Sequence, residues 1–240
     1  MSGAPTPIVF PRGVADPDTS RAYVRAGSGA VIALNLMSGE VLWRSTVGNL
    51  RPLTIVKDML VTARMARPAA IELVVLDTAD GRVLRVSKPL PLPDWARPLL
   101  DDTPEFILRA EAEAQSAVIR WSARARYQGG APPTAQVRES YEREAHGGAR
   151  VNLETGAIEL LDEEIDNAVA FARPQAKSVA EADVLEQQDI GDQHFQLVAR
   201  AETDGTVKVL LRAVERHSGK VFWQSLLEEA PLRRPKPLRP

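Results

Sequence analysis

The amino-acid sequence predicts an all-β protein, a small or partial β-propeller of about four to six blades made of antiparallel meanders, with an irregular middle section. Three observations lead to this prediction. One hairpin pattern occurs four times along the 240 residues. The runs beside each turn are short, apolar and rich in β-branched residues. The first two copies also have the spacing of propeller blades, roughly 40–45 residues.

The four copies align on a glycine that ends a short polar turn. Their sequences are ALNLMSGEVLW, VLDTADGRVLR, RVNLETGAIEL and AVERHSGKVFW, with the glycine at Gly39, Gly81, Gly156 and Gly219. An apolar residue stands five positions before each glycine and another two positions after it, while Asn, Asp or Glu stands four positions before it. Glycine tolerates positive φ, and Asn or Asp caps a turn through its side chain. Each copy is therefore expected to form a β-hairpin.

Further strands are expected around these hairpins. AYVRAG precedes a turn at Ser28 and Gly29, and RPLTIVKDMLVTARM reads as a hairpin with Lys57 and Asp58 in its turn. AVIAL and IELVVL are apolar at nearly every position, which indicates strands covered on both faces. At the C-terminal end, HFQLVARA, TVKVLLRAVE and KVFWQSLL form a three-strand meander.

The middle of the chain is less regular. SAVIRWSARARY alternates strictly, and folding it back on QVRESYEREAH across the loop GGAPPTA sets Arg124 and Arg126 opposite Glu142 and Glu144. These arginines form either a basic patch for an acidic partner or a solvated face of cross-strand ion pairs, each worth ~0.2–1 kcal/mol at most. We favour the ion pairs. The candidate partner contacts are Arg120, Arg124, Arg126, Arg233 and Arg234.

A helix is expected at SVAEADVLEQQ, because Ser178 and Glu181 have the spacing of a capping box. Such an insertion is either decoration on a loop or a place where a partner binds. The loop regions 91–105 and 162–191 are the other expected contact segments.

The glycines are 42, 75 and 63 residues apart, so the longer intervals hold either a degenerate blade or extended loops. The copies resemble the pyrroloquinoline-quinone-type (PQQ-like) propeller repeat, roughly Ala-Leu-Asp-x-x-Thr-Gly-x-x-x-Trp. The residues that match it are Ala33, Leu34, Asn35, Ser38, Gly39 and Trp43 in the first copy, and Ala213, Val214, Ser218, Gly219 and Trp223 in the last. Arg85 and Leu160 stand at the tryptophan position of the other two copies. The resemblance covers residues 21–88 and 192–227.

The resemblance implies that Trp43 and Trp223 pack between neighbouring blades. One branch of the family consists of longer quinone-dependent dehydrogenases that bind quinone and calcium at the propeller axis, often with a vicinal cysteine pair. This chain has no cysteine and too few blades for that branch. The other branch uses the propeller as a binding scaffold, which fits better.

Composition and motifs exclude several kinds of site. The net charge of -2 provides no field that attracts nucleic acid, and the lack of cysteine excludes disulfides and thiolate chemistry. His146, His194 and His217 lack the spacing of a metal pair, and the acidic runs at 101–102 and 162–166 lack the pattern of a calcium loop. No phosphate-binding glycine loop or nucleophile elbow occurs. No catalytic, cofactor or metal residue is expected.

The two ends are expected to lie outside the propeller domain, which spans 21–230. Residues 1–20 form an N-terminal extension without signal-peptide features, no segment is long and apolar enough to span a membrane, and a cytoplasmic location follows. Residues 231–240 form a disordered Pro/Arg-rich tail, either a PxxP ligand or a solubilising end, the latter being favoured.

The expected function is that of a non-catalytic protein-binding scaffold or an accessory subunit of a larger assembly. An unclosed set of blades would expose strand edges and apolar faces, which a second copy or a larger complex would cover. The alternative is a ligand-binding or quinone-dependent enzyme-like module at the propeller axis.

Overall fold

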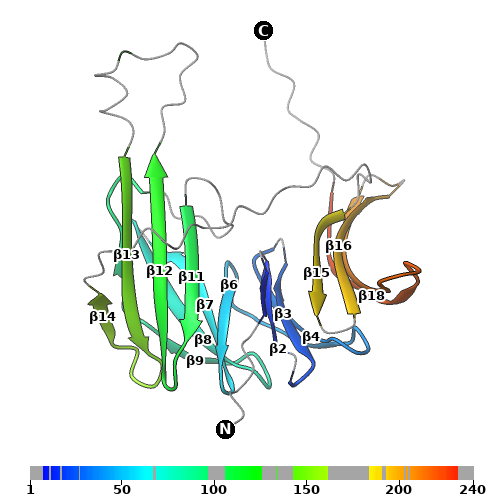
Figure 1. Ribbon diagram of the computed structural model, residues 1–240, viewed down its shortest axis with the longest axis horizontal. Helices are drawn as coiled ribbons and strands as arrows, with labels where there is room; N and C mark the ends of the chain where they lie inside the picture. The colour runs from blue at the N-terminus through cyan, green and yellow to red at the C-terminus, as the bar shows by residue number, and fades with distance from the viewer. Residues whose placement is uncertain are drawn as a thin grey trace.

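The computed structural model describes residues 8–10, 12–16, 18–26, 28–66, 69–96, 106–125, 134, 143–161, 184–190, 193–202, 204 and 206–231. These residues form four antiparallel sheets, which confirms the all-β class, and the four sheets fall within the predicted four to six blades. Each sheet is a meander of strands consecutive in the sequence (Figure 1).

We number the sheets as blades in chain order. Blade 1 contains β1 (Ile8–Phe10), β2 (Gly13–Asp16), β3 (Arg21–Arg25), β4 (Val31–Asn35) and β5 (Val41–Arg44). Blade 2 contains β6 (Arg51–Val56), β7 (Met59–Ala66), β8 (Ala70–Asp77), β9 (Val83–Val86) and β10 (Leu90–Pro91). Blade 3 contains β11 (Phe106–Ala112), β12 (Ser116–Ala125), β13 (Arg143–Asn152) and β14 (Ile158–Leu161). Blade 4 contains β15 (Val184–Ile190), β16 (Gln193–Ala201), β17 (Thr206–Glu215) and β18 (Val221–Pro231).

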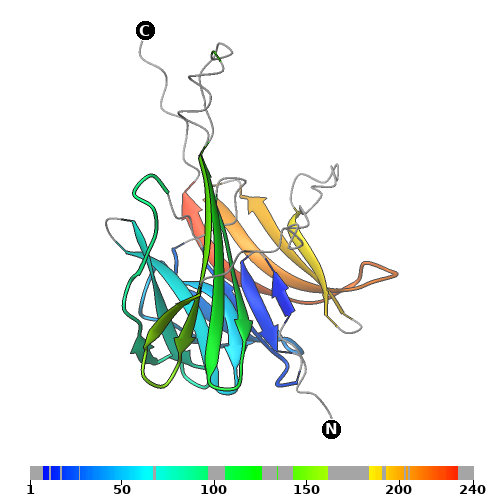
Figure 2. The ribbon, with the colours of Figure 1, turned by 60° about the vertical axis from the view of Figure 1, so that its left-hand side comes forward.

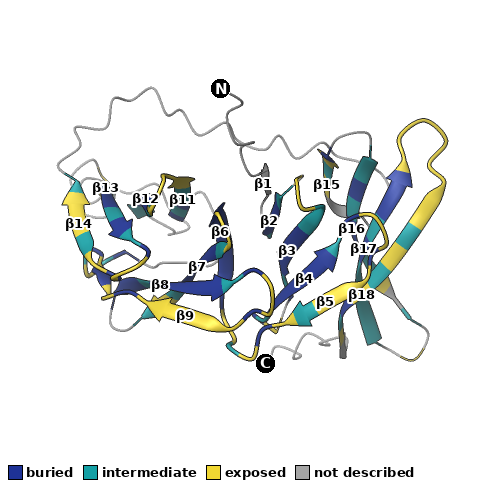
Figure 3. Ribbon diagram, turned by 90° about the horizontal axis from the view of Figure 1, so that it is seen from below, coloured by how far each residue is buried: buried dark blue, intermediate teal, exposed yellow. Residues whose placement is uncertain are grey.

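The blades stand side by side in an open arc, in the spatial order 4, 1, 2, 3 (Figure 3). Their strands β14, β9, β5 and β18 lie on the outside of the arc. The long strands β12 and β13, ten residues each, extend beyond the others (Figure 2).

The core of the protein lies between the blades. Three apolar clusters fill the junctions of blades 4 and 1, 1 and 2, and 2 and 3, and they contain, among others, Ile32, Leu34 and Leu211; Tyr23, Leu60 and Leu76; and Leu73, Leu108 and Ile119. No cluster of the described residues joins blades 3 and 4. Both faces of β4 and β8 are covered, as their apolar runs predicted.

The four hairpin turns have one geometry. The glycine N–H donates to the carbonyl four residues earlier, for example Gly39 to Asn35 at 2.8 Å, and φ is +73° at Gly39 and +68° at Gly219. The Asn35 side chain accepts the N–H groups of Met37 and Ser38 at 2.8 and 3.1 Å. The polar residue before the turn thus satisfies backbone donors that the strand ladder leaves open.

The structure differs from the sequence prediction in three segments. The strands β1 and β2 lie within the predicted extension 1–20 and pair with blade 1. The predicted helix at 178–188 is wrong for residues 184–188, which belong to β15 because they pair along their length with β16. The strand β15 also occupies residues 184–190 of the expected loop 162–191. Pro91, the first residue of the expected loop 91–105, is the last residue of β10.

The middle section is a regular blade where the structure describes it. Strands β11 to β14 pair in continuous register, and the interval of 75 residues contains no fifth sheet within the described ranges. Residues 126–133, 135–142, 162–183 and 232–240 lie outside the described residues.

Candidate protein-interaction surfaces

A tryptophan of one blade packs on the turn glycine of the next. The ring of Trp43 on β5 lies against Gly81 of blade 2, so closely that a Cβ on Gly81 would lie 2.5 Å from its Cε3. Its indole N–H donates to the Thr78 carbonyl at 3.0 Å. We call this arrangement the tryptophan–glycine contact.

The same contact joins the two ends of the sequence. Trp223 on β18 packs on Gly39 of blade 1, and its indole N–H donates to the Leu36 carbonyl at 3.0 Å across 187 residues. The Ser225 hydroxyl adds a hydrogen bond to the Gly39 carbonyl. Leu36 and Thr78 each stand three residues before their glycine, so the two contacts are equivalent. Blade 4 therefore precedes blade 1 in the arc.

Aromatic neighbours support both tryptophans. The ring centroids are 5.7 Å apart for Tyr23 and Trp43, and 5.8 Å apart for Phe195 and Trp223. The Tyr23 hydroxyl also points at the Thr78 carbonyl, at 3.5 Å, and burial raises the pKa of Tyr23 above 10.0. Tyr23 therefore stays a neutral donor at physiological pH.

The junction of blades 2 and 3 uses a different side chain. Arg85 takes the place of tryptophan, and a Cβ on Gly156 would lie 3.3 Å from its Cδ. The buried Arg51 of β6 also crosses this junction and donates to the Leu108 carbonyl at 3.2 Å. The aliphatic stem of Arg85 thus covers the glycine as a ring does elsewhere.

The open end of blade 3 is polar. Blades 1, 2 and 4 carry a bulge in the last strand, at Leu42, Leu84 and Phe222, whereas β14 pairs with β13 without one. A missing bulge moves every later side chain to the other face. Glu159, opposite Arg150, therefore occupies the face on which Trp43 lies opposite Ala33. The alignment of Leu160 with the tryptophans is corrected accordingly: Leu160 is opposite Ala149 and is exposed.

Ion pairs lie on this open face of blade 3. Arg150 donates to the Glu113 carboxylate at 3.0 Å and to the Glu159 carboxylate at 3.2 Å, and these hydrogen bonds, first the one to Glu113, raise the pKa of Arg150. The residues equivalent to Arg150, six positions before the turn glycine, are Ala33, Val75 and Ala213, all at buried junctions. An arginine stands here because this face has no neighbouring blade in the chain.

The open end of blade 4 follows the same rule. Seven positions before the glycine, Ile32, Val74 and Ala149 are buried against the preceding blade, but blade 4 has Arg212, which donates to Gln196 at 2.7 Å. A Cβ on Gly219 would meet none of the described residues within 4 Å. The expectation that an open arc exposes apolar end faces is thus wrong at these two positions, where the faces carry arginine.

Most of the large exposed apolar side chains of the described residues lie on the outer strands, and one of them, Leu226, also shares the open face of blade 4 with Leu210. Large exposed side chains follow the turn glycines of blades 4, 1 and 2, and Figure 3 shows these strands mostly in the colour of exposed residues. We call this set the outer apolar strip; it consists of Val221, Phe222, Val41, Leu42, Val83, Leu84 and Val86. In blade 3, at the end of the arc, Glu159 stands at the position that Leu42, Leu84 and Phe222 occupy in the other blades.

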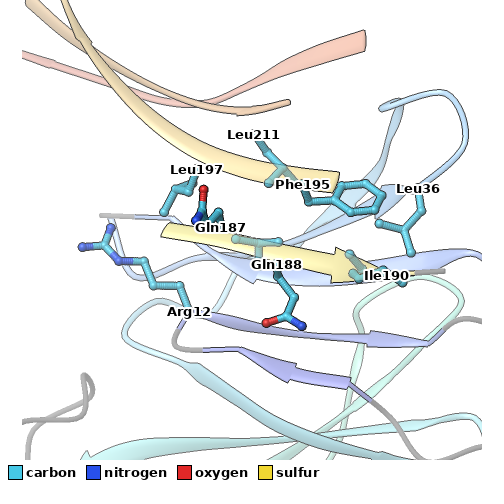
Figure 4. A pocket seen from close by; sticks show the side chains of 10 residues that line it. Arg12, Leu36, Gln187, Gln188, Ile190, Phe195, Leu197 and Leu211 are labelled. Atoms are coloured by element: carbon cyan, nitrogen blue, oxygen red, sulfur yellow. The ribbon is translucent and has the colours of Figure 1, made fainter. Parts of the chain in front are cut away.

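An apolar pocket lies between blades 4 and 1 on the inner side (Figure 4). Its walls are seven apolar residues, Ala22, Val24, Leu36, Ile190, Phe195, Leu197 and Leu211, with Arg12, Gln187 and Gln188 beside them. The Arg12 guanidinium points away from the apolar walls. None of the described residues that line this pocket is a carboxylate or a histidine, so these residues offer apolar contact and no acid–base group.

The predicted partner contacts that the structure describes are ion-paired. Arg124 lies opposite Glu144 in the strand register, with nitrogen and oxygen 2.9 Å apart, and Arg120 contacts Glu111 at 2.8 Å. Arg126, Glu142, Arg233 and Arg234 lie outside the described residues, as do both acidic runs. Within the described part of the chain, no three acidic, histidine or cysteine side chains gather as a metal site would require, and no helix is long and apolar enough to cross a bilayer.

Of the three histidines, His146 and His217 are exposed, and His194 has an acidic neighbour. Its Nδ1 lies 2.6 Å from the Asp189 carboxylate, which Arg216 approaches to 3.5 Å. The hydrogen bond with His194 and the charge of Arg216 lower the pKa of Asp189 below its usual 3.8.

The Asp189 carboxylate is therefore expected to titrate below pH 3.8 in the folded protein. Because the pKa of Asp189 is lower in the folded than in the unfolded state, its ionised carboxylate stabilises the fold at pH values above the unfolded-state pKa. This stabilisation is lost as the pH falls through the folded-state pKa. A carboxyl titration followed by NMR measures the midpoint. His194→Ala should return it toward 3.8, and an unchanged low midpoint in that variant would exclude His194 as the cause.

Only solved structures resemble this chain. No family model matches the chain, and no curated protein does. Among solved structures, BamB from Moraxella catarrhalis is 16% identical with a TM-score of 0.35 over 88% of this chain, and the uncharacterized protein lmo1340 of Listeria monocytogenes is 10% identical with a TM-score of 0.36 over 94%. The β-propeller domain of Cps50 (Swd1) from Myceliophteria thermophila is 9% identical with a TM-score of 0.29 over 96% of this chain and 73% of its own. The chain spans 62% of the BamB chain and 66% of the Listeria chain, and its fold class rests on its own strand pairing.

Proposed function

We propose that the protein is a non-catalytic protein-binding scaffold or accessory subunit, built on PQQ-like repeats, and that its outer apolar strip contacts a partner protein. The observation that carries the proposal is the exposure of seven large apolar side chains on three neighbouring outer strands. Contiguous exposed apolar residues on a soluble protein mark interaction sites.

The bulges explain how the strip can be both exposed and tolerated. Leu42, Leu84 and Phe222 are the extra residues at the three bulges, so they have no cross-strand partner. A bulge also disrupts the ladder at a sheet edge and re-aims a side chain. These three side chains present apolar area while the bulge limits edge-to-edge aggregation.

Serine at all three bulge positions tests the strip. The triple variant Leu42→Ser, Leu84→Ser, Phe222→Ser should unfold at nearly the wild-type temperature, since exposed substitutions change stability by about 0.5 kcal/mol or less. Its capture of the partner should fall at least about tenfold, the equivalent of 1.4 kcal/mol. Tagged protein, chemical cross-linking and mass spectrometry, with reciprocal capture by the tagged partner, measure the loss.

Met65→Ser is the matched control, because Met65 is an exposed large apolar residue on β7 outside the strip. It should bind the partner as the wild type does. If the triple variant binds equally well, the strip is not the contact surface. If the wild type captures no partner in any reciprocal experiment, the scaffold proposal fails.

A further inference from the structure

We propose that a second copy of this chain closes the arc, with the open face of blade 3 of each copy docking on the open face of blade 4 of the other. This inference rests on the proposed scaffold function and states the assembled form in which the scaffold would act. Two arcs of four blades would make a ring of eight, within the usual range of propellers.

The internal junctions supply the geometry for this contact. In each of them the last-strand side of one blade faces the turn glycine of the next, three times in succession from blade 4 to blade 3. At one end of the arc, no described blade packs on the last-strand side of blade 3. At the other end, no described blade packs on the Gly219 turn of blade 4. A second copy placed by a two-fold axis presents the missing half to each end. Identical head-to-tail contacts close into a ring when their rotation permits it.

The open face of blade 3 carries glutamates that are each paired with an arginine. Cross-strand partners share a face, and because Ile119 and Trp121 pack against blade 2, their neighbours Arg120 and Arg124 lie on the open face. On it the carboxylates of Glu111, Glu144 and Glu159 are 70%, 55% and 68% exposed. The arginines that pair with them, Arg120, Arg124 and Arg150, are 28%, 41% and 42% exposed, so the glutamate is the more exposed partner of each pair.

The open face of blade 4 also carries paired charges, but there the arginines are the more exposed partners. Arg200 and Lys208 are cross-strand partners on the side away from Phe195 and Leu211, which pack against blade 1. Arg200 and Arg216 are 65% and 66% exposed, whereas their acidic neighbours Glu202 and Asp189 are 26% and 45% exposed. These two arginines are therefore more exposed than the acids they pair with, and they can complement the exposed glutamates of blade 3. Lys208, 34% exposed, lies opposite the exposed Glu229 on the same face.

Arg150 and Arg212 also fit this arrangement. Interfaces that form between separately folded chains are more polar than the interior of one chain. The junctions within the chain have apolar residues at these two repeat positions, and the two faces left for a second copy have arginine. A polar junction lets the free chain remain soluble and lets the ring form by charge attraction, which added salt weakens.

The first test is the mass of the purified full chain in solution. Light scattering at low ionic strength should give twice the chain mass of 26.2 kDa, falling toward one chain mass when salt is added or the protein is diluted. A single chain mass at every concentration overturns the proposal. Species that grow past two copies also overturn it, because they indicate an open filament.

A charge reversal on each face gives the sharper test. One variant carries Glu111→Lys, Glu144→Lys and Glu159→Lys, and the other carries Arg200→Glu, Lys208→Glu and Arg216→Glu. Each alone has two like-charged faces and should remain monomeric. Mixed in equal amounts they should recover the mass of two copies, since each junction then joins opposite charges. Circular dichroism confirms that both variants fold.

Other outcomes exclude the assignment. If either variant alone forms a dimer as the wild type does, or if the mixture stays monomeric, the two open faces are not the interface. If the serine triple variant of the outer strip abolishes the dimer, self-association occurs through the strip instead. A monomeric chain that still captures its partner overturns ring closure alone and leaves the scaffold function intact.

Discussion

Gly39→Val is expected to be the most destabilising single substitution considered for this protein, at about 3–5 kcal/mol from a left-handed backbone and a steric overlap combined. The φ of Gly39 is +73°, a region that a β-branched residue adopts only with strain. Any Cβ at this position would also collide with the ring of Trp223. Denaturant unfolding monitored by circular dichroism measures the loss.

Gly219→Val separates the two causes. Gly219 has nearly the same φ, +68°, but a Cβ added to it would meet no atom of the described residues within 4 Å. This variant should lose only the backbone part, about 1–2 kcal/mol. The comparison is made at dilutions where the chain is monomeric. Equal losses in the two variants would show that Trp223 does not pack on Gly39.

Trp43→Ala is expected to destabilise the protein by about 2–3 kcal/mol, less than the 3–5 kcal/mol of a fully buried tryptophan, because the ring is half-buried. The ring contacts with Gly81 and Tyr23 and the hydrogen bond to Thr78 are lost together. Trp43→Phe keeps most of the ring and loses the N–H, so about 1 kcal/mol is expected.

Leu160→Ala is the matched control for the tryptophan. Leu160 follows its turn glycine by the same four residues, but it is 63% exposed. Its truncation should change the unfolding free energy by about 0.5 kcal/mol or less. A loss as large as that of Trp43→Ala would contradict the strand register that leaves Leu160 exposed.

The hairpins could be predicted from the sequence because their determinants are local. A turn glycine needs positive φ, and Asn35, Asp77 and Asn152 cap the backbone within three residues. The strand β15 could not be predicted in this way. Its sequence VLEQQDI suits a helix locally, and only pairing with β16 makes it a strand.

The order of the blades could not be predicted either, since it depends on contacts between residues 187 positions apart. The signal for the open faces was nevertheless present in the aligned copies. Arg150 and Arg212 are charged at repeat positions that are apolar in the other blades, as are Arg85 and Glu159 at two further positions. Comparing charge at equivalent repeat positions would have pointed to Arg150, Arg212 and Glu159 at the ends of the arc, and also to Arg85, which covers Gly156 inside it.

Because β14 has no bulge, the sequence alignment of Leu160 with Trp43 and Trp223 is wrong. A bulge adds one residue to a strand and reverses which face the later side chains occupy. The sequence spacing from Gly156 is the same as in the other copies, so spacing alone places Leu160 with Trp43 and Trp223. The register of β13 and β14 places Glu159 there instead.

A double-mutant cycle between Gly39 and Trp223 tests the order of the blades most directly. Gly39→Ala alone forces a methyl group into the indole ring, and Trp223→Ala removes that ring. The double variant should therefore be more stable than the sum of the single losses predicts, with a coupling of about 1–2 kcal/mol. Losses that add within about 0.3–0.5 kcal/mol would contradict the contact between blade 4 and blade 1, and with it the open arc.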